Sequence, residues 1–372
     1  MKMKIIEVSS DTNIGGAGKC LLTLLENFDY DKFEVKTVLP KNSLLKPHIE
    51  KLGIEVIEAD GIADKSLDFG AVKELTQIFK REKPDLVHTH ASMSARIAAK
   101  RAGAKIVYTR HSVFPPSKKI SKGLGKKING FVNNRLADGI IAVAEAAKEN
   151  LTDTGVDEKK ITVILNGVDG LERVGDTEKI RERFGVKNGE KVVSIVARLE
   201  DIKGHMYFIE AADEILKTVP NVKFFIAGTG SYENTLKEKV KSLGLCENVI
   251  FTGFISDVDK LMNITDIQAN ASYGTEATSL ALLEGMSIGI PAVVSDFGGN
   301  PGVIKNGENG LVVPKKNSHA LAEGIKKLLT DSECYKKMSD GAVKIFNETF
   351  TAKAMTKNTE DLYIKIIGKE RL

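Results

Sequence analysis

Two glutamates, Glu276 and Glu284, have the spacing that most directly suggests chemistry in this chain. Glu276 follows a polar turn, and an apolar run from Leu280 predicts that a helix begins there. On a helix, positions eight apart lie within about 80° of one face and about 12 Å apart along the axis. This span suits a nucleotide-sugar, whose diphosphate the free N–H groups of a helix N-terminus favour. The segment therefore predicts a donor site for a nucleotide-sugar.

Two cationic residues and a glycine-rich loop could bind the same ligand. Arg198 and Lys203 follow a predicted strand, and charge-assisted hydrogen bonds of about 1.5–3 kcal/mol each would neutralise a leaving diphosphate without a metal. Gly15 and Gly16 follow the first predicted strand and would let backbone N–H groups approach a phosphate. The loop matches neither a P-loop nor a GxGxxG motif. Solvated surface cations and a plain tight turn remain the alternatives.

Two histidines, His88 and His90, lie at the end of the fourth predicted strand, where alternation places both rings on one face. A metal pair is conceivable, but no Cys, His or acidic residue follows at a suitable spacing. We therefore expect His90, the last strand residue, to hydrogen-bond at a cleft and His88 to pack within the fold. His111, which ends the next strand, is a weaker cleft candidate.

Asp257 and Asp259 form an acidic pair of the kind that holds a divalent metal in some enzymes. The residues that follow, 258–264, read as the start of a surface helix, where acidic side chains are favoured in any case. We expect no metal site here.

Residues 117–135 form a basic segment without an acidic residue. Apolar residues recur in it at helical spacing, which predicts an amphipathic helix able to dock on anionic lipid or on an anionic acceptor. The alternative is a lysine-rich solvated helix packed on its sheet. The cations are Lys118, Lys119, Lys122, Lys126, Lys127 and Arg135, and the apolar residues are Ile120, Leu124, Ile128 and Phe131.

The elements that must position these residues alternate between short apolar runs and longer segments of helical period, which predicts βαβ units and parallel sheets. Strands are expected at 4–8, 34–39, 54–58, 85–88, 105–109, 139–143 and 161–165, then at 191–197, 222–227, 248–252, 267–271 and 292–295. Helices are expected at 69–81, 92–102, 207–217, 232–243 and 280–286, and throughout 318–372. Two doubly wound α/β domains with a cleft at the carboxyl ends of their strands follow. The predicted boundaries are 1–168, a linker at 169–190, 191–350, and a terminal helix at 351–372.

Composition narrows the class of protein. The length of 372 residues favours two domains, and 42% hydrophobic with 28% charged residues is typical of a soluble globular protein. A net charge of +4 makes no global case for binding nucleic acid. Cys20, Cys246 and Cys334 are far apart and predict reduced thiols. Without a signal peptide or a long apolar stretch, we expect a cytoplasmic protein, peripheral at most at the inner face of a membrane.

Taken in order, these motifs resemble those of the retaining GT-B glycosyltransferases of family four, along essentially the whole chain. The likeness extends to Asn166-Gly-Val-Asp169, Ala227-Gly-Thr-Gly230, Thr252-Gly-Phe254, Gly298-Gly-Asn-Pro301 and the run from Asn306 to Pro314. The resemblance implies two Rossmann-like domains with the donor mainly on the second. It also implies a last helix that crosses back to the first domain.

The resemblance also implies roles for single residues. Glu284 would bond the ribose and Glu276 the donor sugar, with Arg198 and Lys203 on the diphosphate. Gly15 and Gly16 would lie beside the diphosphate, and His90 near the reacting end of the sugar. Thr278, Ser279 and Leu280 would complete the donor site. No metal or other cofactor is implied.

Two positions depart from the family's pattern. The family often has Gly-Phe-Gly after the first glutamate, where this chain has Ala277-Thr278-Ser279, so the sugar pocket would differ in shape. Thr278 or Ser279 would add a hydroxyl contact or an N-cap. The family also often has a glutamate after the Gly-Gly turn, where this chain has Gly302.

The expected reaction is transfer of a hexose-type sugar from a UDP-sugar to an acceptor hydroxyl, with retention, in assembly of a cell-surface glycan or glycolipid. The expected partners are that donor and a carbohydrate or lipid-linked acceptor, with no nucleic acid. Two alternatives stay open. One is a nucleotide-sugar 2-epimerase-like isomerase, which needs acid/base carboxylates in both domains. The other is a non-catalytic nucleotide-sugar binding subunit.

Overall fold

The computed structural model describes residues 2–63, 66–90, 92–113 and 116–368 and divides the chain into two compact units. Unit 1 consists of Met1–Gly167 and Ala352–Leu372, and unit 2 of Val168–Thr351. Residues 369–372 of the expected terminal helix lie outside the described residues.

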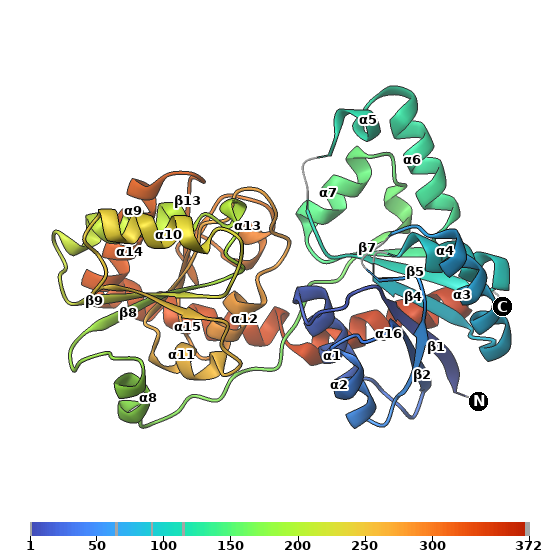
Figure 1. The fold of residues 1–372 in the computed structure, drawn as a ribbon, viewed down its shortest axis with the longest axis horizontal. Coiled ribbons are helices and arrows are strands. Elements are labelled where there is room, and N and C mark those ends of the chain that lie inside the picture. The colour runs from blue at the N-terminus through green and yellow to red at the C-terminus, as the bar shows by residue number, and fades with distance from the viewer. Residues whose placement is uncertain (1, 64–65, 91, 114–115, 369–372) are drawn as a thin grey trace. The chain divides into compact units, whose positions relative to one another are not determined.

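Unit 1 is a parallel seven-stranded sheet with helices on its faces (Figure 1). Its strands are β1 (Met3–Ser9), β2 (Phe33–Pro40), β3 (Glu55–Ala59), β4 (Leu86–His90), β5 (Lys105–Arg110), β6 (Gly139–Ala142) and β7 (Ile161–Val163), in the order β3-β2-β1-β4-β5-β6-β7. Its helices are α1 (Gly16–Glu26), α2 (Lys46–Lys51), α3 (Phe69–Glu82), α4 (Met93–Ala102), α5 (Lys118–Ser121), α6 (Gly123–Arg135), α7 (Glu145–Asp153), the short η1 (Glu158–Lys160) and α16 (Ala352–Gly368).

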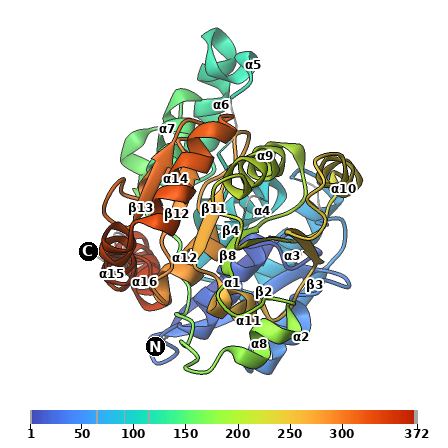
Figure 2. The ribbon, with the colours of Figure 1, turned by 90° about the vertical axis from the view of Figure 1, so that its left-hand side faces the viewer.

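Unit 2 is a parallel six-stranded sheet, also covered by helices (Figure 2). Its strands are β8 (Lys191–Val196), β9 (Val222–Ala227), β10 (Val249–Gly253), β11 (Ile267–Asn270), β12 (Ala292–Ser295) and β13 (Gly310–Val313), in the order β10-β9-β8-β11-β12-β13. Its helices are α8 (Glu178–Arg183), η2 (Asp201–Lys203), α9 (His205–Leu216), α10 (Glu233–Ser242), α11 (Val258–Ile264), α12 (Leu280–Ser287), α13 (Asn300–Val303), α14 (Ser318–Thr330) and α15 (Ser332–Thr349).

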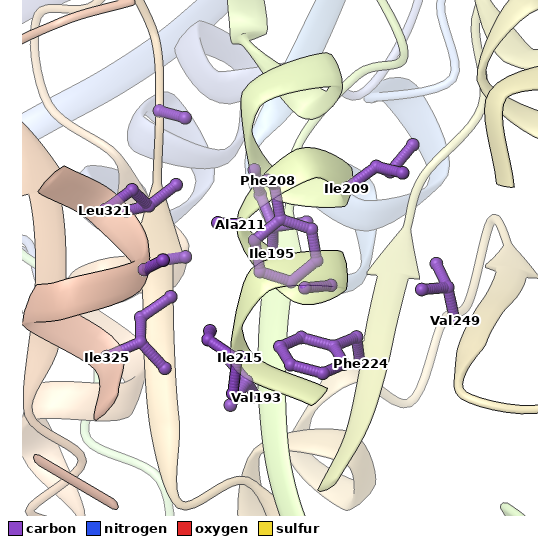
Figure 3. Packing of buried hydrophobic residues seen from close by; sticks show 14 of the residues in the cluster. Val193, Ile195, Phe208, Ile209, Ala211, Ile215, Phe224, Val249, Leu321 and Ile325 are labelled. Carbon is purple, nitrogen blue, oxygen red and sulfur yellow. The ribbon is translucent and has the colours of Figure 1, made fainter. Parts of the chain in front are cut away.

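The core of unit 2 shows why these strands read as continuous apolar runs. Helices cover both faces of a parallel sheet, so side chains on both faces of each strand are buried. Phe208 of α9 packs on Phe224 of β9 and Ile195 of β8, and none of the three is more than 2% exposed (Figure 3). This packing fixes the carboxyl ends of β8 and β11, where the candidate residues of unit 2 begin.

The predicted α/β class and both parallel sheets are confirmed, and strand β13 is an addition. It pairs with β12 at the edge of the sheet and spans four residues before Pro314, too few to show a clear period. Residues 169–190, expected as a linker, lie in unit 2, where the backbone N–H groups of Leu171 and Val174 donate to the side chains of Ser287 and Asn263. None of the described helices combines the length and apolar character needed to cross a membrane.

Candidate active site

A buried ion pair between Lys203 and Glu276 forms the centre of the polar site in unit 2. Lys203 Nζ lies 3.0 Å from Glu276 Oε2 and donates to the Thr275 carbonyl at 2.9 Å. The two side chains are only 13% and 8% exposed. The pair joins the two segments that follow β8 and β11, the strands at the centre of the sheet.

Two glycines make this approach geometrically feasible. Gly204, at φ +75°, passes so close to the strand end that a Cβ would lie 2.1 Å from the Ala271 carbonyl oxygen. Gly298, at φ +60°, would place a Cβ 2.1 Å from the Glu276 carbonyl oxygen, which accepts a hydrogen bond from the N–H of Gly299. Only glycine fits both the dihedral angles and the space. The Gly298 turn thus packs on the backbone that carries Glu276.

A set of buried polar side chains surrounds the Glu276 carboxylate. Its Oε2 accepts hydrogen bonds from Asn270 Nδ2 at 3.3 Å and Ser272 Oγ at 3.1 Å, in addition to Lys203. Asn300 Nδ2 lies 3.4 Å from Asn270 Oδ1 and donates to Ser295 Oγ at 3.0 Å. The charge of Glu276 is therefore satisfied by three donors, which come from the segment after β8 and from the end of β11.

Helix α12 begins at Leu280, which corrects the expected geometry of the two glutamates. Glu276 lies in the loop before the helix and only Glu284 lies on it, so the common-face argument for both was wrong. The residues Ala277-Thr278-Ser279 connect Glu276 to the helix. The helix N-terminus does lie between the two glutamates, as expected. Ser279 occupies the N-cap position without a side-chain cap bond.

Arg198 stands after β8 in a different environment from Lys203. Its side chain is 70% exposed, and Arg198 Nη1 donates to Glu200 Oε1 at 2.7 Å. The contact is local and solvent-exposed, so the side chain can turn towards a ligand without disturbing the core. Thr278, Ser279, Leu280 and Glu284 are all half-buried, while Ala277 is buried.

The glycines of the first loop are not required by the fold of unit 1. Gly15 is the N-cap residue of α1 at φ −92°, and a Cβ at Gly15 or Gly16 would meet no atom within 4 Å. Gly18, one turn further, does pack, because its Cβ would lie 3.0 Å from Leu45 Cδ2. Open space at both positions leaves the helix N-terminus accessible to a ligand.

His90 lies in a buried hydrogen-bonded cluster at the carboxyl end of β4. Its Nδ1 is 2.7 Å from His111 Nε2, and its Nε2 is 3.2 Å from Glu7 Oε2. The Tyr363 hydroxyl of α16 donates to Glu7 Oε1 at 2.8 Å. A cavity of about 20 Å³ beside His88, His90 and His111 has room for about one water molecule and not for a sugar. Contact between His90 and a ligand would require the bond to His111 to open.

The ionisation of this cluster follows from its hydrogen bonds. Burial raises the pKa of Glu7, but the charge and hydrogen bond of His88 and the hydrogen bond of His90 outweigh it and lower that pKa to about 2. Burial lowers the pKa of His88, and burial together with His90 lowers the pKa of His111 well below its usual value. Burial raises the pKa of the Cys20 thiol to about 12, so this cysteine is inert.

The structure corrects the expectation that His88 and His90 have no third ligand-type neighbour. Glu7 of the adjacent strand β1 pairs in register with His88, and Glu7, His88 and His90 have the side-chain atoms of a metal-binding group. As expected, the rings of His88 and His90 lie on the same side of β4, with their centroids 4.5 Å apart. His88 Nε2 is bonded to Thr109 Oγ1 at 2.6 Å, so each ring nitrogen of the pair has a hydrogen-bonding partner without a metal.

Asp257 and Asp259 lie at the start of helix α11, as their sequence context indicated. Asp257 is paired with Arg183 and Asp259 with Lys260, so each carboxylate has a cation beside it.

The buried residues that hydrogen-bond to the candidate residues in the two units were not identified from the sequence. Glu7 carried a usable signal, because an acid in the apolar run of a parallel-sheet strand must be buried and needs partners. Asn270 carried the same signal at the end of β11. Tyr363 carried none, because nothing in the sequence relates a tyrosine in the last helix to β1 and β4.

Comparison with known proteins adds a family to this geometry. Residues 14–170 match the family described as Glycosyltransferase Family 4, and residues 176–344 the family described as Glycosyl transferases group 1. An Escherichia coli protein named UDP-Gal:alpha-D-GlcNAc-diphosphoundecaprenol alpha-1,3-galactosyltransferase is 26% identical over 98% of each chain.

Solved structures show the same fold. HepE of Anabaena, crystallised with UDP and glucose, superimposes with a TM-score of 0.84 at 24% identity, covering 97% of this chain and 99% of its own. A glycosyltransferase from Rickettsia africae gives a TM-score of 0.85 at 22% identity, covering 98% and 99%.

The two Rossmann-like units and these structural likenesses show that the chain has the GT-B fold. The chain belongs to family four of the glycosyltransferases, the group 1 glycosyl transferases.

Proposed function

We propose that this enzyme transfers a hexose-type sugar from a nucleotide-diphosphate-sugar, with UDP as the nucleotide, to an acceptor hydroxyl. The observation that carries this proposal is the buried Lys203–Glu276 pair, in which Lys203 follows β8 and Glu276 lies in the loop between β11 and α12. Ligands of parallel α/β sheets bind outside the carboxyl ends of the strands. The pair brings a cation for a diphosphate and an acceptor of sugar hydroxyl bonds to that position.

Lys203 and Arg198 would stabilise the leaving nucleotide diphosphate. Both follow β8, and the N-terminus of α12 adds N–H groups and the positive end of a helix dipole. These donors supply the positive charge that a divalent metal provides elsewhere, so we propose a metal-independent reaction. Glu284 would bond the ribose, with Thr278, Ser279 and Leu280 against the donor.

Glu276 is proposed to hold a hydroxyl of the donor sugar rather than to attack it. Its Oε2 already accepts bonds from Lys203, Asn270 and Ser272, which makes that oxygen a poor nucleophile. Retention, which the resemblance implies, would then proceed without a sugar bonded to Glu276. Nuclear magnetic resonance of the product's anomeric carbon would test the retention.

From unit 1, the open N-terminus of α1 at Gly15 and Gly16 would receive the diphosphate, and His90 would act at the sugar once its bond to His111 opens. The Escherichia coli relative carries a lipid-diphosphate acceptor in its name. We therefore propose a lipid-linked or carbohydrate acceptor in cell-surface glycan or glycolipid assembly, which would place the enzyme at the inner face of a membrane.

The decisive experiment measures UDP release from a panel of UDP-sugars with a candidate lipid-linked acceptor, in the presence of EDTA. We expect release by the wild type and at least about a hundredfold loss in Lys203→Ala, because an electrostatic donor to the transition state is removed. Lys217→Ala, which removes an exposed lysine paired within α9, is the control and should be unaffected.

Three outcomes would contradict the proposal. Unchanged turnover in Lys203→Ala would show that the Lys203–Glu276 pair is not the site of the reaction. Conversion of the donor to an epimer without acceptor would indicate an isomerase. Donor binding without release of UDP under any acceptor would indicate a binding subunit.

A further inference from the structure

Helix α6 of unit 1 turns its apolar face away from the protein. Leu124, Ile128 and Phe131 are 72%, 55% and 69% exposed, and their spacing of four and three residues places them on one face. A helix on the surface of a globular protein ordinarily buries such a face against the core. Of the two alternatives left open by the sequence, packing of these apolar residues on the sheet is therefore wrong.

The opposite face of α6 attaches the helix to unit 1 through polar and small residues. Asn129 Nδ2 donates to the Thr154 carbonyl at 2.7 Å, and Asn133 Oδ1 accepts from Arg96 at 3.0 Å. Gly130 is buried, and a Cβ there would lie 2.1 Å from the Gly155 carbonyl oxygen. The helix is thus held firmly in an orientation that leaves its apolar residues in solvent.

Residues 117–135, here called the basic lobe, add a charge pattern to this exposed face. The lobe consists of α5 and α6, which stand off the sheet of unit 1 (Figures 1 and 2). Ile120 of α5 is also exposed, at 40%. The lobe contains no acidic residue. Five of its cations are exposed: Lys118, Lys119, Lys122, Lys127 and Arg135.

We propose that the basic lobe docks on an anionic membrane, with Leu124, Ile128 and Phe131 entering the region between headgroups and acyl chains. Apolar residues flanked by lysines suit this interface, because the chains leave water while the cations contact anionic headgroups. A second copy of the chain fits less well, since two such faces would bring cations of like sign together. The inference rests on unit 1 alone and stands whether or not the proposed transfer reaction is correct.

The chain contains no tryptophan, so one introduced tryptophan reports on a single position. Phe131→Trp places the reporter in the lobe, and Phe69→Trp places a control at the start of α3, where the phenylalanine is 80% exposed. With vesicles of phosphatidylcholine and phosphatidylglycerol, we expect a blue shift and quenching by brominated lipid for Phe131→Trp only. Equal spectra for the two variants, or no change at position 131, would overturn the proposal.

Vesicle sedimentation separates the apolar and electrostatic parts. The triple variant Leu124→Ser/Ile128→Ser/Phe131→Ser keeps every charge, and we expect about tenfold weaker binding or more, because it removes the inserted surface. Neutralising Lys118, Lys119, Lys122 and Lys127 to Gln should abolish the preference for anionic over neutral vesicles. Lys51→Gln/Lys80→Gln, at two exposed sites elsewhere in unit 1, is the charge-matched control for part of that change.

Light scattering without lipid tests the other possible occupant of this face, a second copy of the chain. The proposal expects the same mass for the wild type and the triple variant. A wild-type dimer that the triple variant abolishes, with no vesicle binding, would assign the face to a second copy and overturn the membrane assignment. Unchanged vesicle binding by the triple variant would also overturn the membrane assignment.

Discussion

Single residues decide the chemistry of the site in unit 2. Lys203 is positioned by Glu276 and Thr275, and Glu276 by three donors, so neither group is free to move independently of the other. Of these residues, the sequence pointed to Lys203 and Glu276 through their types and their places after strands. The supporting residues come together only in the folded unit, since Asn270 and Ser272 lie at the end of β11 and Asn300 begins α13.

Buried titratable residues in unit 1 make its stability depend on pH. The pKa values of His88 and His111 lie below the unfolded value of 6.5, so the unfolded chain binds more protons and stability falls as pH falls through that value. The pKa of Glu7 falls from 4.5 to about 2, so its contribution is present above pH 4.5 and is lost between these two values.

We therefore expect the unfolding temperature to fall steadily from pH 7 to pH 4, which scanning calorimetry at a series of pH values would measure. His111→Asn should flatten the part of the curve around pH 6. A curve that rises towards acid, or one that His111→Asn leaves unchanged, would contradict the assigned directions of the pKa values.

At the scale of elements, the turns that follow the strands bring the candidate residues together. The sequence predicted the parallel strands well, because apolar runs mark strands buried on both faces. The apolar run correctly predicted that helix α12 begins at Leu280, but helical geometry was wrongly extended to Glu276, which lies in the loop before the helix. Strand β13 was missed because it is short. For α6, the periodicity identified an apolar face but left open whether that face packs on the sheet or docks on another surface.

Two glycine variants test the roles of these turns. Gly298→Ala should destabilise the protein by roughly 2 kcal/mol and reduce turnover, because the φ of +60° and the contact with the Glu276 carbonyl both exclude a Cβ. Gly16→Ala should leave stability nearly unchanged yet reduce turnover, because its Cβ would enter only the space proposed for the diphosphate.

Urea denaturation and UDP-release assays of the two variants provide the comparison. Unchanged turnover in Gly16→Ala would contradict the role proposed for the open space, and an equal loss of stability in both variants would contradict the claim that a Cβ at Gly16 meets no atom.

At the scale of the whole molecule, the last helix ties the end of the chain to unit 1. Tyr363 of α16 is fully buried and completes the cluster around Glu7, while Met355 and Leu362 enter the core beside α1. The site in unit 2 thus combines separate loops of one continuous part of the chain, whereas the cluster in unit 1 combines residues from both ends of the chain. Sequence order could suggest the first and had no means of assembling the second.

The central claim, that unit 2 binds a nucleotide-sugar without a metal, is tested most directly by isothermal titration calorimetry of the full chain with UDP-sugars in EDTA. We predict saturable binding by the wild type of one UDP-sugar per chain, and at least about tenfold weaker binding by Glu284→Ala, since a charge-assisted hydrogen bond is lost. Absence of binding in EDTA that added magnesium or manganese restores, or equal affinity of wild type and Glu284→Ala, would contradict the claim.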